Sequence, residues 1–222
     1  MSKTDPILGA LVNQHLTEKG INTPMVVNNL SDEQKIKEVE RLTKETLEVL
    51  GLDLTDDSLI ETPMRVAKMY VQEIFAGLNP DNFPKCTTVE NKFSHGQEFV
   101  CERNITLYSD CEHHLRPIIG VAHIAYIPKK KVLGLSKLNR VAQYFAQRPQ
   151  VQERLNEQIA HALSFIIESD DVIVMIEAKH TCVSQRGIKD TNSVTATLTA
   201  LGQFGTRNSH LRQEFINSVR GG

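Results

Sequence analysis

The chain has 222 residues, of which 40% are hydrophobic, enough to bury one main core with a smaller appendage. Its 25 Lys and Arg residues oppose 27 Asp and Glu residues, so the formal net charge of -2 argues against a nucleic-acid binder or a protein of anionic membrane surfaces. No apolar run approaches the roughly 20 residues that span a bilayer, and a signal-peptide pattern is absent, so a cytoplasmic protein without a membrane partner is expected.

The N-terminal segment is expected to be helical. Asp5 and Pro6 stand at the start of an apolar series with helical spacing, and Gly20 stands at its end. This pattern predicts a helix within an arm over residues 1–30, which we expect to be detachable from the rest of the chain.

Residues 31–85 have the spacing of two further helices. Ser31 and Gln34 form a candidate capping box, and Gly51 stands where a helix commonly ends. Thr62, which is followed by proline, is expected to be the N-cap of the next helix. The segment is therefore interpreted as a separate helical region.

The remaining residues, 86–222, have the pattern of an α+β domain, in the order strands, two helices, strands and a closing helix. Ser136 is expected to cap the first of the two helices, and Pro149 is expected to open the second. Strands are expected over residues 98–107, 118–127, 172–182 and 193–201, and the closing helix over residues 209–220.

Cysteine and histidine residues form the sharpest chemical pattern. Cys111 and His114 have the close spacing by which a turn presents two ligands to one metal ion. On a strand, His180 and Cys182 would share one face, because side chains alternate with a period of two. Together, Cys111, His114 and Cys182 would leave the fourth tetrahedral position of Zn²⁺ open for water, as catalytic zinc sites do. His113 and His180 would then be the first-choice proton donors or acceptors beside that water.

Three other interpretations of these residues stay open. Cys111 and Cys182 would be ordinary packing residues if the two adjacent histidines belonged to a solvated loop. A non-catalytic zinc site would be closed by a fourth protein ligand such as His180, and the protein would then be a zinc-stabilised oligomer. Iron or manganese could replace zinc, because sulfur and imidazole ligands leave metal selectivity partly to availability. Cys86 and Cys101 lack nearby partners and are interpreted as small apolar residues.

A second group of residues has the character of an anion site. In the first turn of a helix, free backbone N–H groups and the helix dipole attract negative charge. Alternatively, Ser136 only caps the helix, and the Lys and Arg side chains named below form a solvated face. The candidate residues are Ser136, Lys137, Arg140 and Arg186, with Arg65 and Lys68 from another helix or subunit.

Four blocks of the sequence resemble the GTP cyclohydrolase I family: ETPMRVAKMY, CEHHLRPIIGVAHIAYIP, GLSKLNRVAQYFAQRPQVQERL and HTCVSQRGIKD. The resemblance extends over residues 38–220, while the segment before residue 29 matches weakly and Arg116 departs from the expected pattern. It implies an α+β tunnelling fold for residues 86–222, in which an antiparallel sheet with two helices packed on it assembles into a pentameric barrel. Two such barrels stack into a homodecamer, with active sites at subunit junctions.

The resemblance also implies the reaction and the roles of the metal site. GTP and water are the substrates, and zinc held by Cys111, His114 and Cys182 activates the water that attacks C8 of the guanine. His113 and His180 handle protons during ring opening and the loss of formate. The product is 7,8-dihydroneopterin 3′-triphosphate, and the reaction is the first step of tetrahydrofolate biosynthesis.

The same resemblance assigns the substrate contacts. Glu153, helped by Gln152, would hold the guanine edge, since one carboxylate can accept both adjacent guanine donors. The position of Glu153 at a helix start also has a purely structural reason, because the helix dipole favours a carboxylate there. Ser136 would also assist the sugar rearrangement. The triphosphate and ribose would be held by Ser136, Lys137, Arg140 and Arg186, with Arg65 and Lys68 as further candidates.

The nearest alternative is another tunnelling-fold enzyme of deazaguanine metabolism, such as a nitrile reductase with a cysteine nucleophile and a nicotinamide cofactor. The Cys-Glu-His-His block, together with the distant Cys182, argues against that alternative.

Overall fold

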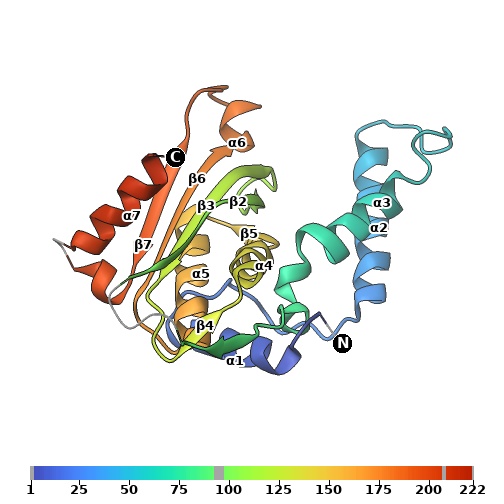
Figure 1. Ribbon diagram of the computed structural model, residues 1–222. Coiled ribbons are helices and arrows are strands. Elements are labelled where there is room, and N and C mark those ends of the chain that lie inside the picture. Colours follow the sequence, from blue (N-terminus) through green and yellow to red (C-terminus); the bar gives the residue numbers. More distant parts are fainter. Residues whose placement is uncertain (1–2, 93–97, 207–208, 222) are drawn as a thin grey trace.

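The computed structural model describes residues 3–92, 98–206 and 209–221. These residues form an α+β structure (Figure 1). The helices are α1 (Pro6–Glu18), α2 (Asp32–Val49), α3 (Thr62–Lys68), α4 (Leu135–Ala146), α5 (Gln152–Ile167), α6 (Thr181–Ser184) and α7 (His210–Arg220), and a π-helical segment, Met69–Ile74, continues α3. The strands are β1 (Thr88–Glu90), β2 (Val100–Cys111), β3 (Pro117–Tyr126), β4 (Lys131–Leu133), β5 (Pro149–Gln150), β6 (Val172–His180) and β7 (Thr195–Ala200).

A curled five-stranded sheet in the order β5-β2-β3-β6-β7 is the centre of the fold (Figure 1). The neighbours β2, β3, β6 and β7 pair antiparallel, whereas β5 pairs parallel with the end of β2, so the sheet is mixed. The expected α+β class and the expected order of elements are confirmed. A second, two-stranded sheet pairs β1 with β4 antiparallel. The five-stranded sheet is open in the single chain, and the barrel assembly stays a prediction.

The two faces of the sheet bury different partners, because successive strand side chains point to opposite faces. Ala122 and Ile124 of β3 belong to the main core with α4 and α5. Ala125, the residue after Ile124, points to the opposite face and packs in a smaller cluster that includes Phe204 and Phe215 of the C-terminal segment. Helices α4 and α5 therefore cover one face, and α7 lies on the other (Figure 1).

Three expected helix starts are wrong. Thr62 is the first residue of α3, and Glu61, not Thr62, is its N-cap. Gly134, and not Ser136, is the N-cap of α4, which puts Ser136 inside the first turn. Pro149 does not open a helix: it pairs with Asp110 in β5, and α5 begins at Gln152. The physical reason is that the parallel pairing with β2 extends the backbone after α4 before the chain can coil again.

The N-terminal helix is part of the core, so the expectation of a detachable arm is wrong for α1. Val12 and Leu16 are 1% and 0% exposed and belong to the main core cluster. The segment after α1 is also held by hydrogen bonds, since the buried Arg148 donates to Asn22 Oδ1 and Thr23 Oγ1 at 3.2 and 3.3 Å. The boundary drawn at residue 31 stays a prediction.

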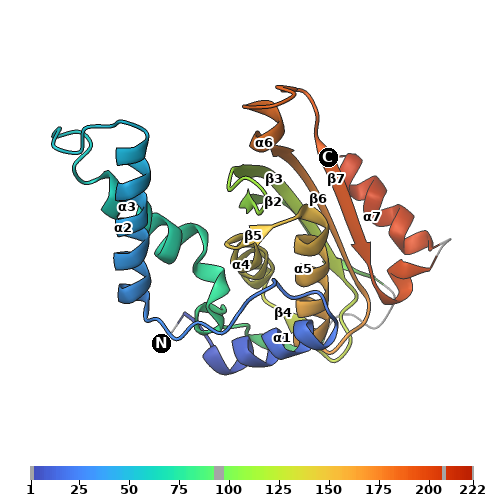
Figure 2. The same ribbon diagram turned by 180° about the vertical axis from the view of Figure 1, so that it is seen from behind.

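Helices α2 and α3 project from the body of the molecule (Figure 2). The capping box of Ser31 and Gln34 is confirmed, and Gly51 follows α2 with a positive φ of 83°. No residue of α2 is buried, although the helix carries apolar side chains such as Leu42, which is 51% exposed. An apolar helix face is therefore uncovered in the single chain.

None of the helices in the described part of the chain has the length and apolar character that crossing a membrane requires.

The contact between α1 and α5 is predicted to weaken in acid. The rings of His15 and His161 lie 6.5 Å apart, and burial lowers the pKa of both from 6.5, with the Lys19 charge adding to the effect. The opposing carboxylates are Glu18 for His15 and Glu157 for His161. The unfolded segment therefore binds more protons than the folded one, so stability falls as the pH drops from about 6.5 to the folded-state pKa values.

Hydrogen exchange of α1, corrected for the intrinsic exchange rate, measures this contact as a function of pH. Opening of α1 should become easier between pH 7 and pH 5 in the wild type, and the double variant His15→Gln, His161→Gln should lose most of that dependence. An equal pH dependence in both proteins would contradict the assignment.

Candidate metal centre

The turn between β2 and β3 gathers the first two candidate ligands. The Cys111 N–H donates to the carbonyl of Arg116 at 2.9 Å, and the Leu115 N–H donates to the carbonyl of Cys111 at 2.8 Å. Leu115 has a positive φ of 47°, which is uncommon for a residue other than glycine and lets the chain reverse within the turn. As a result, Cys111 and His114 lie on the same side of a tight turn.

The third candidate ligand, Cys182, lies on a different element from the expected one. Strand β6 ends at His180, and Cys182 lies in the short helix α6, so the prediction that both share a strand face is wrong. Thr181 causes the difference, because its hydroxyl donates to the carbonyl of Pro117 at 2.7 Å and holds the start of α6 against β3. The pairing of His180 with Ile118 brings α6 to the β2–β3 turn.

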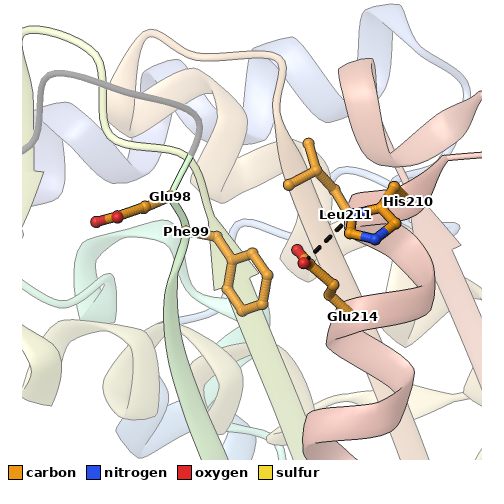
Figure 3. A pocket seen from close by; sticks show the side chains of 5 residues that line it. All are labelled: Glu98, Phe99, His210, Leu211 and Glu214. Atoms are coloured by element: carbon orange, nitrogen blue, oxygen red, sulfur yellow. Dashed lines mark ion pairs between the residues drawn. The ribbon is translucent and has the colours of Figure 1, made fainter.

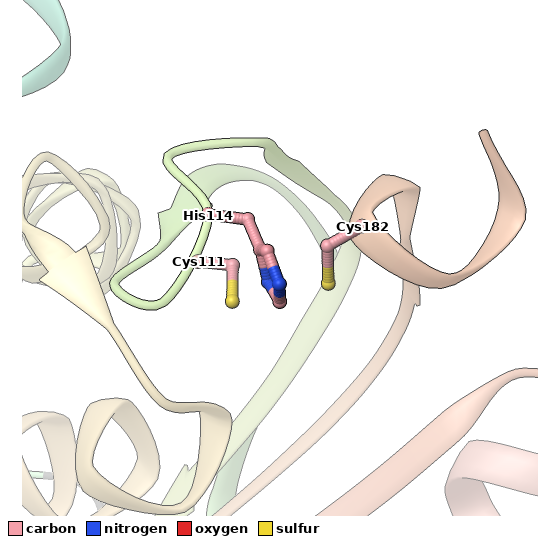
Figure 4. A group of neighbouring side chains, drawn as sticks. All are labelled: Cys111, His114 and Cys182. Atoms are coloured by element: carbon pink, nitrogen blue, oxygen red, sulfur yellow. The ribbon is translucent and has the colours of Figure 1, made fainter. Parts of the chain in front are cut away.

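Cys111, His114 and Cys182, named the ligand cluster below, have one ligand atom each within 4.8 Å of one another (Figure 4). Ligand atoms around a tetrahedral zinc ion lie about 3.5 Å apart, so small side-chain rotations suffice to close the site. Two thiols and one imidazole suit a thiophilic divalent metal better than magnesium or calcium. Among the described residues, this is the one group of three or more such side chains close enough to hold a metal ion.

A metal ion that enters the ligand cluster has to displace a thiol proton beside a guanidinium group. Partial burial and the Cys111 thiol raise the pKa of Cys182, so its thiol holds a proton that a metal ion must displace. The guanidinium of Arg186 lies at the edge of the cluster, with Nη1 at 3.0 Å from His114 Nε2. Arg116, the departure from the expected pattern, hydrogen-bonds Gln185 and so connects the turn to the segment after α6.

His113 lies beside the ligand cluster and is exposed. Its Nδ1 is 3.9 Å from the Cys111 sulfur, and its Nε2 is 3.8 Å from Glu112 Oε1. Glu112 in turn accepts two hydrogen bonds of 2.8 Å from Arg154 of α5. The sequence analysis missed this pair, although Arg154 directly follows the two residues of α5 that it did select.

His180 approaches the same region from the end of β6. Its Nε2 lies 2.8 Å from Gln152 Oε1, and burial lowers its pKa while the nearby Glu153 carboxylate opposes that shift. Gln152 is 2% exposed, whereas Glu153 is exposed in a groove between α5 and the outer strand β7. His113 and Arg186 thus lie against the ligand cluster. His180, two residues before Cys182, lies beside Gln152 and near Glu153.

The other candidate cations lie elsewhere in the chain. Lys137 and Arg140 are close enough to Cys86 to lower its pKa, although burial dominates and raises that pKa to about 11. Ser136 and Lys137 stand in the first turn of α4 and Arg140 at its middle, whereas the end of α4 leads to β5 beside Cys111. At 1.5 Å per residue, the two ends of the helix are about 16 Å apart.

Helix α3 carries the remaining two candidates away from the ligand cluster, in the projecting part of the chain (Figure 2). Arg65 is exposed and pairs with Glu61 at 2.6 Å, and Lys68 is exposed at the end of α3. Among the described residues, no hydrogen bond or ion pair joins these cations or those of α4 to the ligand cluster.

A different pocket lies on the far side of the sheet, between α7 and the start of β2 (Figure 3). Its lining includes Phe99 and an ion pair of 3.3 Å between His210 and Glu214. It contains none of the residues selected from the sequence.

Comparison with known proteins gives one consistent result. The family model described as GTP cyclohydrolase I matches residues 39–220. The chain is 53% identical over 210 residues to a protein of Vibrio vulnificus (strain YJ016) named GTP cyclohydrolase 1, a match that covers 95% of this chain and 96% of that protein. Proteins of the same name from Vibrio cholerae serotype O1 and Photobacterium profundum are each 52% identical with the same coverage.

Loss of the Arg154 side chain is predicted to weaken metal binding without unfolding the protein. Arg154→Met leaves Glu112 without its partner, and the turn that presents Cys111 and His114 becomes less well ordered. Loss of a residue that holds metal ligands in place typically lowers metal affinity 10- to 100-fold. We expect a decrease of about 10-fold in zinc affinity, measured by competition with a chromogenic chelator. Arg41→Met, which removes a similar ion-pairing arginine from the exposed face of α2, is the control and should leave the affinity unchanged.

Proposed function

Because this chain belongs to the GTP cyclohydrolase I family, whose members are enzymes that hydrolyse GTP, we propose that its ligand cluster holds the zinc ion of that reaction. The observation that carries the proposal is the convergence of two thiols and one imidazole from two distant segments on a single point. Three protein ligands leave one tetrahedral position open, as a catalytic zinc site requires.

The closed, structural interpretation of the site needs a fourth protein ligand. His180 is the candidate for it, but its Nε2 already lies 2.8 Å from Gln152, and His180 is not part of the ligand cluster. This arrangement favours an open site.

The bound zinc would supply a water of lowered pKa for attack on C8 of the guanine. His113 and His180 would carry the protons. His113 is exposed beside the Cys111 sulfur and can exchange protons with solvent, whereas His180 is half-buried and is held by a protein hydrogen bond. Ring opening, the loss of formate and rearrangement would then yield 7,8-dihydroneopterin 3′-triphosphate, the first step of tetrahydrofolate biosynthesis.

The guanine edge would be bound by Glu153. Its carboxylate is exposed in the groove beside β7 and lies close enough to His180 to influence its pKa. An ionised carboxylate can accept from both the N1–H and the exocyclic amine of guanine. Gln152 would support the site from behind, because its amide is occupied by protein partners.

The triphosphate would be bound across a subunit junction. Arg186 stands beside the ligand cluster, but Ser136 and Lys137 lie at the opposite end of α4 and Arg140 at its middle. Arg65 and Lys68 lie on the projecting helix α3. A GTP molecule bound at the ligand cluster therefore needs the cations of a neighbouring copy. Ser136 would also assist the sugar rearrangement from that position.

The open sheet supports such an assembly. Strand β7 has no partner on its outer side, and β5 pairs with only Asp110 and Cys111 of β2, so both edges of the described sheet are available for pairing. Copies joined edge to edge would close into the expected barrel, and the uncovered apolar face of α2 would join two rings into the homodecamer.

Cys182→Ser is predicted to abolish turnover while leaving the oligomer folded. Serine is a poor zinc ligand, so the open site loses its metal. Formate release and the fluorescence of oxidised neopterin measure the reaction with GTP, and the metal content is quantified in parallel. Chelator treatment of the wild type should have the same effect, reversed by added Zn²⁺; if the variant unfolds instead, the metal has a structural role.

Mixed oligomers are predicted to recover activity lost in two single variants. Lys137→Ala and Cys182→Ser damage opposite sides of the proposed junction. When the two inactive proteins are dissociated and reassembled together, some junctions combine two intact sides, so part of the activity should return. A site built within one chain would stay inactive in every mixture.

A further inference from the structure

The geometry points to Gln152 as a positioning residue that holds His180 in one neutral tautomer, with the hydrogen on Nε2 and the lone pair on Nδ1. This inference rests on the proposed role of His180 as a proton carrier. Gln152 opens α5, is 2% exposed, and reaches back to the end of β6.

The orientation of the Gln152 amide follows from its partners. Nε2 donates to the carbonyls of Ile176 and Thr195, each at 3.0 Å. Carbonyl oxygens only accept hydrogen bonds, so the group that faces them must be the NH₂ and not the oxygen. The hydroxyl of Thr197 lies at 3.1 Å from the same nitrogen. The amide cannot be rotated by 180° without facing two carbonyls with its own oxygen.

The same argument determines the proton on His180. With the NH₂ directed at β6 and β7, Gln152 Oε1 faces His180 Nε2 at 2.8 Å. That oxygen can only accept, so Nε2 must donate and carries the hydrogen. In a neutral imidazole the other nitrogen then has the lone pair, and among the described residues His180 Nδ1 has no hydrogen-bond partner.

This arrangement restricts what each residue can do. Neutral His180 can take a proton only at Nδ1, and the imidazolium so formed keeps its hydrogen bond to Gln152 until Nδ1 returns the proton. Gln152 has no amide hydrogen left for the guanine, because three acceptors surround its two hydrogens. Loss of the Gln152 amide should therefore lower kcat and leave KM for GTP unchanged.

The test combines histidine NMR with kinetics on the metal-loaded oligomer. Protein labelled with ¹⁵N in histidine is sedimented and measured by solid-state NMR at about pH 8, above the ordinary histidine pKa of about 6.5. The signals of His180 are identified by their loss in His180→Gln. In the wild type, His180 Nε2 should give a protonated-nitrogen signal and Nδ1 an unprotonated one.

Gln152→Met is the matching variant, because methionine has a similar size and offers no comparable acceptor. His180 should then populate both tautomers, and kcat should fall about 10²-fold at constant KM, within the range that general acid–base catalysis contributes. Gln158→Met is the control: Gln158 is 0% exposed on the same helix, and its amide donates to Ile21 and Thr23 instead of contacting His180. It should preserve both kcat and the His180 tautomer.

A wild-type spectrum with the hydrogen on Nδ1 would overturn the inference, and this measurement does not depend on the folding of Gln152→Met. An increased KM with unchanged kcat in Gln152→Met would also overturn it and would return Gln152 to the substrate. If His180→Gln keeps the wild-type kcat, the proposed proton-carrying role of His180 fails, while the NMR result still decides the tautomer.

Discussion

The register between β3 and β6 is the constraint on which the candidate site depends. Ile118 pairs with His180, so the end of β6 arrives where the β2–β3 turn begins. Cys111 and His114 come from that turn, and Cys182 follows β6 by two residues. A slip of one residue would exchange the faces of every side chain on β6 and would move His180 away from Gln152. The metal site and the core are therefore specified by the same strand pairing.

Buried polar side chains connect this sheet to the surrounding helices. Arg148, Gln150, Gln152 and Gln158 are each at most 2% exposed, and each hydrogen-bonds backbone carbonyls. A buried polar group without a partner costs more than a hydrogen bond contributes, so such residues tolerate few alternative arrangements. Their bonds hold the segment after α1, the end of α4 and the start of α5 in fixed relation. Of these four side chains, Gln152 is the one that contacts His180.

The candidate residues fall into two separate groups, and the proposed assembly would bring these groups together. The ligand cluster and Glu153 belong to one end of the sheet, whereas Lys137 and Arg140 belong to the first half of α4. Neither group alone offers both ligands for a metal ion and a set of cationic side chains for a triphosphate. Pairing of the free sheet edges would unite them, so catalysis and oligomerisation would depend on the same contacts.

Local patterns in the sequence determined much of this protein: the capping box of α2, the α+β order of elements, and the residue types of the ligand cluster. Each depends on neighbours within a few positions or on the intrinsic chemistry of a side chain. Tertiary structure alone decided that α1 joins the core, that Pro149 extends into β5, and that Cys182 stands on α6. It also decided the partners of Gln152, because Ile176 and Thr195 come from strands more than twenty residues away in the chain. Such contacts follow from long-range pairing, which no local periodicity contains.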